Sequence, residues 1–171
     1  AQLNEWELAN ILQAMRWAFR QRKLDVLSEE FLRELHRRMF DETWAWAGNF
    51  RQSDKNIGVD WGHIPVRLRT LLDDVRTQVE YQSYSATEIA VRFHHRLVQI
   101  HLFPNGNGRH ARLSADFLSR KLTGSPLSWV ASELTAADEN RRRYIAALRA
   151  ADAHDYRGLL EFCNGKARTL G

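Results

Sequence analysis

One short segment of the sequence gathers the residue types that phosphate chemistry requires. It runs from His101 to Arg112 and reads HLFPNGNGRHAR. The pattern predicts a helix that ends at the histidine, a glycine-rich turn, and a new helix that begins at about Asn107. The backbone amides of Gly106, Asn107 and Gly108 are predicted to bind an anion, because the first amides of a helix lack an acceptor within it and the helix dipole favours negative charge.

Three side chains around this turn add positive charge and a proton acceptor. Arg109 and Arg112 lie three residues apart on one side of the new helix, so both can reach the same anion. His101 lies on the other side of the turn, where it is suited to act as a general base. The alternative is a tight interhelical turn with a histidine that caps carbonyl groups. The fixed register of all these residue types favours a phosphate site with a base beside it.

The rest of the sequence predicts the helices that position this segment. Apolar residues recur at helical spacing on both sides of it, which indicates an all-α fold. Residues 48–62 (GNFRQSDKNIGVDWG) lack this period and predict a small hairpin or an irregular flap at about 49–58. No repeat or linker divides the chain, so we expect a single domain over residues 1–171. The candidate N-caps are Asn4, Ser28, Ser85, Thr135 and Asp155.

Composition excludes several other classes of protein. The single cysteine, Cys163, excludes an internal disulfide and a CxxC metal or redox site. The sequence shows no apolar run of about 20 residues and no signal-peptide pattern, so we expect a cytoplasmic protein with no membrane partner. The net charge is +4, but the arginine runs lie on helical segments and no nucleic-acid module is present, so no direct nucleic-acid partner is expected. His94, His95 and His101 lack a carboxylate or cysteine to complete a metal site.

The segment from 101 to 112 resembles the core motif of the Fic (Fido-domain) family, HxFx[D/E]GNGRxxR. The matching positions are His101, Phe103, Gly106, Asn107, Gly108, Arg109 and Arg112. The strings DKNIG and FPNGNGRHAR are similar to the branch called mobile mystery protein B, and the helical layout resembles a Fic core over most of the chain. This resemblance implies a Fic-type helical bundle with a short β-hairpin flap.

The resemblance also implies a protein adenylyltransferase of bacterial, toxin-like type. Such an enzyme transfers AMP from ATP, with Mg²⁺, to a Ser, Thr or Tyr hydroxyl of a target protein. His101 would deprotonate that hydroxyl, and residues 106–108 would form the anion hole, with Asn107 near the α-phosphate. Arg109 and Arg112 would hold the β- and γ-phosphates. This assignment agrees with the needs of displacement at phosphorus, which are positioning, charge neutralisation and a base.

The resemblance gives further residues a role in binding. Phe103 would anchor the loop in the core. The flap from Phe50 to Val59 would pair with a segment of the target by strand addition. Lys55 and Ile57 are the flap residues expected to touch the target or the nucleotide. Tyr144 is expected to pack in the core, with the lining of an adenine pocket as the alternative.

Two departures from the family motif leave alternatives open. Asn105 replaces the acidic residue that holds Mg²⁺, and an uncharged amide oxygen binds a hard cation more weakly. Mg²⁺ would then depend on the phosphates of ATP, and a weakly active nucleotide-binding module is one alternative. Leu102 replaces the usual proline, which affects only loop stiffness. A Doc-like phosphotransferase with reversed ATP is the other alternative, although Gly108 stands where such proteins usually have lysine.

Inhibition of the site is the last expectation. Residues 135–140 (TAADEN) match the inhibitory string [S/T]xxxE[G/N], whose glutamate would be Glu139. A capping box formed by Thr135 and Asp138 explains the same residues and is the favoured interpretation. We therefore expect Arg112 to be unpaired in this chain alone, with an antitoxin or a segment upstream of Ala1 as the inhibitor.

Overall fold

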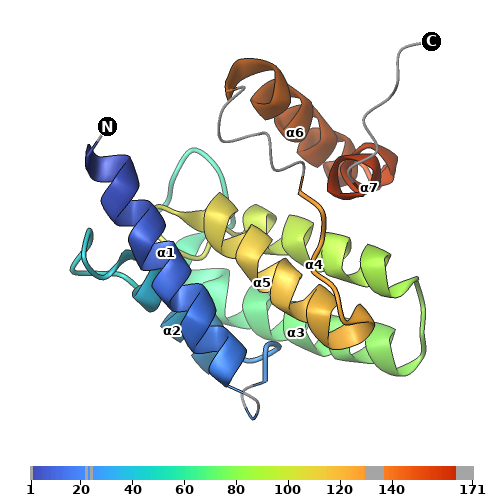
Figure 1. Cartoon of the computed structure of the whole chain (residues 1–171). Coiled ribbons are helices and arrows are strands. Elements are labelled where there is room, and N and C mark those ends of the chain that lie inside the picture. The colour runs from blue at the N-terminus through green and yellow to red at the C-terminus, as the bar shows by residue number, and fades with distance from the viewer. Residues whose placement is uncertain (1, 22, 24, 130–136, 165–171) are drawn as a thin grey trace.

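Helices make up most of the chain in the computed structural model, which describes residues 2–21, 23, 25–129 and 137–164. The described part contains the helices α1 (Gln2–Arg20), α2 (Glu29–Phe40), α3 (Ile64–Glu80), α4 (Ala86–Ile100), α5 (Asn107–Thr123), α6 (Ala137–Asp152) and α7 (Arg157–Cys163). A short 3₁₀-helix, η1 (Trp61–His63), leads into α3. The all-α fold is therefore confirmed (Figure 1).

The central helix is α4, which packs against α3, α5 and α7. Helix α2 packs on α5, α1 packs on α2, and α6 and α7 form a pair (Figure 1). The buried side chains of α4 are those of Ile89, Ala90, Val91, Phe93, His94, His95, Leu97 and Ile100. Because close-packed neighbours enclose α4, the residue after its last turn, His101, has a fixed place in the fold.

Two of the predicted N-caps are confirmed. The Ser28 hydroxyl accepts a hydrogen bond from the backbone N–H of Phe31 at 3.1 Å, at the start of α2. The Ser85 hydroxyl accepts one from the backbone N–H of Glu88 at 3.2 Å, at the start of α4. Each bond satisfies one of the amides that a helix leaves without an internal acceptor. The start of α4, and so the register of its far end, is therefore set by a local sequence signal.

The other predicted caps have different outcomes. The prediction for Asn4 is wrong, because α1 begins at Gln2 and places Asn4 within its first turn, where an N-cap residue would not be helical. Thr135 lies outside the described residues. The Asp155 carboxylate accepts a hydrogen bond from the backbone N–H of Arg157 at 3.2 Å, so it satisfies the first amide of α7.

The flap between α2 and α3 is a loop, so the hairpin part of the prediction is wrong. Residues 49–60 contain no strand. The two sides of the flap bind the end of α4 and the chain just after it, because Val59 N–H donates to Ile100 O at 3.3 Å and Arg51 N–H donates to Leu102 O at 3.0 Å. The Arg51 side chain donates to the carbonyl oxygens of Ser53 and Val59. These carbonyl groups are therefore satisfied by a side chain and not by a cross-strand ladder.

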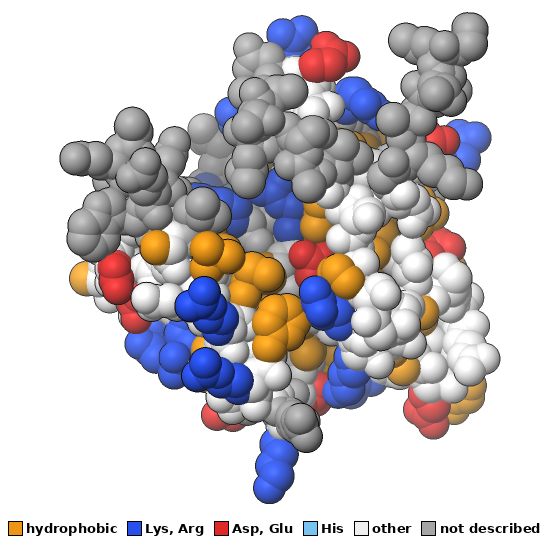
Figure 2. All heavy atoms as spheres, in the orientation of Figure 1, with side chains coloured by type: hydrophobic (Ala, Val, Ile, Leu, Met, Phe, Trp, Pro, Cys, Tyr) orange, Lys and Arg blue, Asp and Glu red, His pale blue; other side chains and the backbone are white. Residues whose placement is uncertain are grey.

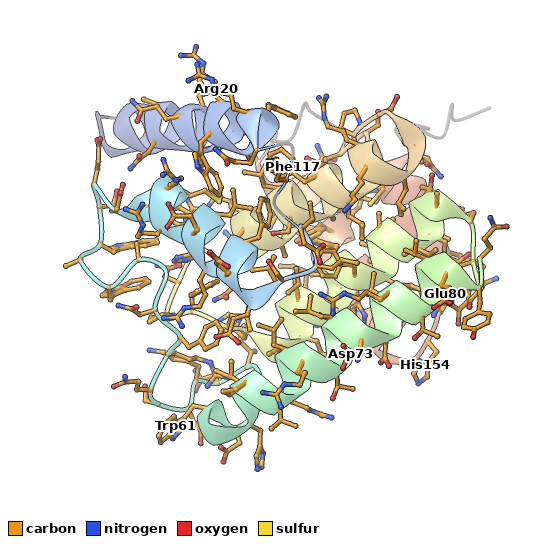
Figure 3. The ribbon with its side chains drawn as sticks, turned by 90° about the horizontal axis from the view of Figure 1, so that it is seen from below. Arg20, Trp61, Asp73, Glu80, Phe117 and His154 are labelled. Carbon is orange, nitrogen blue, oxygen red and sulfur yellow. The ribbon has the colours of Figure 1, made fainter. Side chains whose placement is uncertain are left out.

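Aromatic rings join α1 to the central helices. Phe117 of α5 lies near the end of α1 (Figure 3), and its ring centroid is 5.1 Å from that of Phe19 and 6.0 Å from that of Phe31. These edge-on contacts are the arrangement that aromatic quadrupoles favour. None of the helices in the described ranges is both long and apolar enough to cross a lipid bilayer.

The positively charged side chains are distributed over the surface, and the arginine run of α2 is paired with an acidic residue. On the face shown in Figure 2, Lys and Arg side chains are spread over the surface among hydrophobic and neutral atoms. The arginine pair of α2 is paired with an acid, since Arg37 and Arg38 each lie 2.6 Å from a carboxylate oxygen of Glu34. This run is therefore a charge-paired helix face, as its place on a helical segment predicted.

Candidate functional site

A cavity of about 680 Å³ lies where the α4–α5 loop meets α6 and α7. One side of it is polar and is formed by His101, the loop at 105–107, and the first turns of α5 with their two arginines. The opposite side is mainly apolar. It is formed by Val98 of α4, Tyr144, Ile145 and Leu148 of α6, and Phe162 of α7, and it also includes the polar Asn140 and Arg141 of α6. A cavity with one cationic and one apolar side suits a ligand that joins an anionic group to a flat hydrophobic one.

The loop between α4 and α5 is shaped by two residues with left-handed backbone. His101 has a φ of 59°, and Gly106 has a φ of 78°. A Cβ atom on Gly106 would lie 2.6 Å from a ring carbon of Phe40, so this position requires glycine for both conformation and space. The turn therefore depends on the glycine at position 106.

The Asn107 side chain holds the loop from within. Its Oδ1 accepts the backbone N–H of Phe103 at 2.9 Å, and its Nδ2 donates to the carbonyl oxygen of Phe103 at 2.7 Å. The Phe103 ring is fully buried, which agrees with its expected role as the loop anchor. Asn107 lines the cavity, while its side chain is bound to the loop.

His36 of α2 is a site residue that sequence reasoning missed. The backbone N–H of Gly48 donates to His36 Nδ1 at 2.9 Å, so the ring proton must be on Nε2, which donates to the carbonyl oxygen of Asn105 at 3.0 Å. Burial lowers the pKa of His36 to about 4, which keeps the ring neutral. Its centroid lies 3.7 Å from that of Phe103. The feature of the sequence that could have identified His36 is its position within the apolar stripe of a predicted helix.

Gly108 is open toward the cavity. A Cβ atom built on it would meet no described atom outside its own helix within 4 Å, although the residue is helical and glycine is a poor helix former. Nothing in the described part of the chain therefore requires glycine at 108. Close approach of a bound group to the backbone N–H explains this choice, and it is the arrangement that phosphate binding at a helix N-terminus uses.

The two arginines of α5 stand on aromatic rings beside these amides. The guanidinium carbon of Arg109 lies 4.9 Å from the ring centroid of Phe40, and that of Arg112 lies 5.4 Å from that of Tyr144. Burial, and then the charge of Arg112, lower the pKa of Arg109. Arg112 forms no ion pair with any residue of the described ranges. Two neighbouring cations that repel each other favour a shared anion.

His101 is placed to act as a base at neutral pH. The residue is half-buried at the edge of the cavity, and burial lowers its pKa, followed by the charges of Arg51 and Lys55. A lowered pKa leaves the imidazole neutral at pH 7, which is the form that accepts a proton. Its Nδ1 atom is buried and has no hydrogen-bond partner among the described residues.

Asn105 does not form a metal site. Its Oδ1 is uncharged and accepts the backbone N–H of Gly106 at 2.7 Å, and its backbone carbonyl oxygen accepts from His36, so both of its oxygens take part in holding the loop. Within the described ranges, no group of three or more His, Cys, Asp or Glu side chains could hold a metal ion. The donors around the loop are amides and arginines, which suit an anion and do not fit a protein-bound Mg²⁺.

The other predicted residues lie around the cavity or pack beside it. Ile57 of the flap lines the cavity and is 62% exposed, while Lys55 is exposed on the flap. Tyr144 lines the cavity and also packs on the core, with its hydroxyl 2.9 Å from His94 Nε2. His95 binds the Asp152 carboxylate at 2.8 Å.

Glu139 does not pair with Arg112. Both residues are described, Glu139 is exposed on α6, and no ion pair joins them. The TAADEN string therefore does not close the site in this chain through that glutamate. The Thr135 half of the favoured capping box lies outside the described residues, so that interpretation stays a prediction.

Comparison with known proteins gives the same family as the motif. The model of the Fic/DOC family matches residues 26–119, which is more than half of the chain. "Protein adenylyltransferase Fic" of Aedes aegypti is 26% identical over 147 residues, covering 82% of this chain. The chain spans only 28% of that relative's length.

Solved structures show the same fold. Fic-1 (residues 134–508) from C. elegans matches with a TM-score of 0.67 and 25% identity, over 88% of this chain and 46% of that one. BepC of Bartonella tribocorum, solved with bound AMPPNP, matches with a TM-score of 0.70 and 17% identity, over 95% of this chain and 85% of that one.

Proposed function

Since this chain belongs to the Fic/DOC family, we propose that it is a protein adenylyltransferase that transfers AMP from ATP to a hydroxyl side chain of a target protein. The observation that carries the proposal is Gly108, which is open to a cationic cavity and has a neutral histidine at the cavity's edge. The adenylyltransferase name of the mosquito relative and the AMPPNP bound to BepC support ATP as the substrate.

In this proposal ATP lies across the cavity, with its triphosphate on one side and its adenine ring on the other. The triphosphate lies on the cationic side, where the amides of Asn107 and Gly108 and the guanidinium groups of Arg109 and Arg112 neutralise its charge, while the Gly106 amide is held by Asn105 Oδ1. The adenine ring lies on the apolar side, against Tyr144 and its neighbours on α6. Arg109 and Arg112 follow the loop by one helical turn, so they hold the β- and γ-phosphates that leave as pyrophosphate.

His101 starts the transfer by taking the proton of the target hydroxyl. The resulting oxygen attacks the α-phosphorus, a P–O bond to AMP forms, and the bond to the β-phosphate oxygen breaks. The loop amides stabilise the charge that develops on the α-phosphate, because their positions are fixed before the reaction by Asn107 and His36. Positioning by binding supplies much of the remaining rate enhancement.

The arginines carry the charge neutralisation that a protein-bound Mg²⁺ would otherwise share. The oxygen of Asn105 is used by the loop, so any Mg²⁺ enters as a companion of the ATP phosphates. This observation also favours a second candidate function, a nucleotide-binding module with little turnover. Phosphoryl transfer with reversed ATP remains the third interpretation, and the small Gly108 argues against it.

The target and any regulator are part of the same proposal. We propose that the exposed flap, with Lys55 and Ile57, contacts the target protein beside His101. A toxin-like regulator of this kind requires a separate antitoxin or an added segment to close the site over Arg112.

The experiment that separates an enzyme from a binding module uses His101→Ala. ATP binding is measured by isothermal titration calorimetry, and transfer from α-labelled ATP is measured in a bacterial lysate, for wild type and variant. The enzyme interpretation predicts that transfer disappears while ATP affinity stays within about threefold, because the base contacts the hydroxyl and not the triphosphate. Equal transfer by both proteins contradicts the proposal, and binding without transfer by either protein supports the module.

A further inference from the structure

Arg51 is a fully buried arginine within an exposed segment. It is 2% exposed, whereas residues 52–58 on the same flap are all exposed. A buried guanidinium is costly unless each N–H group finds an acceptor. The partners of Arg51 therefore show why the fold keeps this charge inside.

The guanidinium joins two segments that are distant in sequence. On the flap it donates to Ser53 O at 2.9 Å and to Val59 O. At the end of α4 it donates to His101 O at 2.7 Å and to Ile100 O at 3.3 Å. The last carbonyl groups of a helix lack internal donors and carry its negative dipole end, so a cation there is favourable. One side chain thus closes the flap onto the end of the central helix.

This connection acts directly on His101. The left-handed backbone of a histidine costs energy and persists only where surrounding groups hold it. Arg51 holds the carbonyl oxygen of His101, while the flap glycine, Gly58, lies against the base of its side chain. A Cβ on Gly58 would lie 2.7 Å from the Cβ of His101 and 2.8 Å from a guanidinium nitrogen of Arg51. A glycine at position 58 therefore lets the flap lie directly against His101 and Arg51.

We propose that Arg51 is a positioning residue that holds the flap closed and fixes the backbone and the ring environment of His101. It does not line the cavity, so it acts through His101 and not on the nucleotide. The consequence for catalysis rests on the proposed transferase function, whereas the effect on the flap and on His101 does not. A residue that only stabilised the fold would lower the protection of all core amides alike.

The first test is hydrogen exchange of the flap in Arg51→Lys, which keeps the charge but loses the forked geometry. Exchange at the amides of residues 51 and 59 should be about tenfold faster or more, because several charge-assisted bonds that hold the flap are lost. Amides in the middle of α5 should change much less. Equal acceleration in α5 and the flap, or no change in the flap, overturns the proposal.

Two further variants keep this test independent of folding failure. Gly58→Ala keeps the Arg51 residue but its methyl group would overlap both His101 and the Arg51 guanidinium, so it should push the flap away and give the same local increase in exchange. Arg33→Lys is the matched control, since Arg33 also donates to a loop carbonyl, Gly48 O at 2.9 Å, and stacks on Phe50 at the start of the flap, whereas its hydrogen bonds go to Glu29, Gly48 and Asn49 and not to the far side of the flap. The control should leave the amide of residue 59 unchanged.

The second test is an NMR titration of the ring of His101 with labelled histidine. The charged groups that face this ring are Arg51 and Lys55 of the flap, with the arginines of α5 and Arg141 of α6 around the same cavity. Because burial is the main cause of the low pKa, opening the flap should raise the pKa of His101 toward its ordinary value in both Arg51→Lys and Gly58→Ala. An unchanged pKa in both variants overturns the proposal.

The catalytic readout distinguishes failure of this proposal from failure of the proposed function. Arg51→Lys should lower kcat by about a hundredfold, as misplacement of a catalytic group does, with the KM for ATP changed by less than threefold. An unchanged kcat, or a rise in KM alone, contradicts the positioning role. If wild type transfers nothing, the transferase function fails, and the exchange and titration results still decide the role of Arg51.

Discussion

Gly108 offers a substitution that should improve the fold while it damages the site. In Gly108→Ala the added methyl group meets none of the described atoms outside its own helix within 4 Å, and the backbone is already helical. Replacing glycine by alanine in a helix stabilises it by about 1 kcal/mol or slightly less. For a chain of this size that free energy corresponds to a rise in Tm of about 2–4 °C.

The same methyl group should weaken nucleotide binding. Gly108 lines the cavity, so its Cβ would stand where a phosphate approaches the amides of α5. Losing one charge-assisted hydrogen bond costs about 1.5–3 kcal/mol, which weakens ATP binding about tenfold to a hundredfold. The assays are a thermal melt without ligand and a calorimetric titration with ATP.

Gly106→Ala is the matched control for this experiment. Its Cβ would overlap the Phe40 ring at 2.6 Å in a left-handed backbone, so we expect a loss of about 2–4 kcal/mol of stability. The reasoning about Gly108 is refuted if Gly108→Ala binds ATP as wild type does, or if it melts at a lower temperature. Either result would mean that the open space above Gly108 is not the phosphate position.

Three further predictions concern the loop and the buried ionisable groups. Asn105→Asp should make the rate of transfer depend more strongly on Mg²⁺, because one carboxylate oxygen can accept the N–H of Gly106 while the other is free for the ion. The measurement is the rate of transfer over a range of Mg²⁺ concentrations, and the same dependence in wild type and variant would contradict the prediction. The pKa of His36 is about 4 in the folded chain and about 6.5 in the unfolded chain, so the unfolded chain binds more protons between these pH values. The free energy of unfolding of wild type should therefore fall by up to about 3 kcal/mol relative to His36→Gln as the pH falls from 7 to 4. Urea unfolding at a series of pH values measures this difference. Burial raises the pKa of Asp116 to about 7, although the hydrogen bond that Trp129 Nε1 donates to it at 2.7 Å acts in the opposite direction. Between the ordinary pKa of an aspartate and pH 7 the folded chain therefore binds more protons than the unfolded chain, and wild type loses stability as the pH rises. Asp116→Asn should therefore gain up to about 4 kcal/mol relative to wild type between pH 4 and pH 8, and a constant difference in the same urea series would exclude this shift.

The elements that carry the loop could be predicted because their signals are local. Ser28 and Ser85 cap the helices they precede, and Pro104, Gly106 and Gly108 mark the break between α4 and α5. The backbone at Gly106 needs glycine for reasons that lie within a few residues and one packed ring. Such features depend on short-range geometry, which sequence spacing records.

The supports of the loop could not be predicted because their partners are distant in sequence. His36 reaches Asn105 across 69 residues, and Arg51 reaches the carbonyl oxygen of His101 across 50. The hairpin prediction was wrong for the same reason, since the flap pairs with the chain after α4 and not with itself. Asn107 was assigned to the phosphate, while its side chain holds Phe103. Sequence spacing shows which residues are unusual, but not which distant groups they bind.

The central claim is that this cavity transfers the α-phosphoryl group of ATP, with its adenosine, under the control of His101. It is tested most directly by paired labelling of a bacterial lysate with ATP labelled at the α- or the γ-phosphate, using wild type and His101→Ala. An adenylyltransferase should give label from the α position only, on a protein band that is absent with the variant. Label from the γ position only would contradict the claim, because ATP would then lie reversed in the cavity and the chain would be a phosphotransferase.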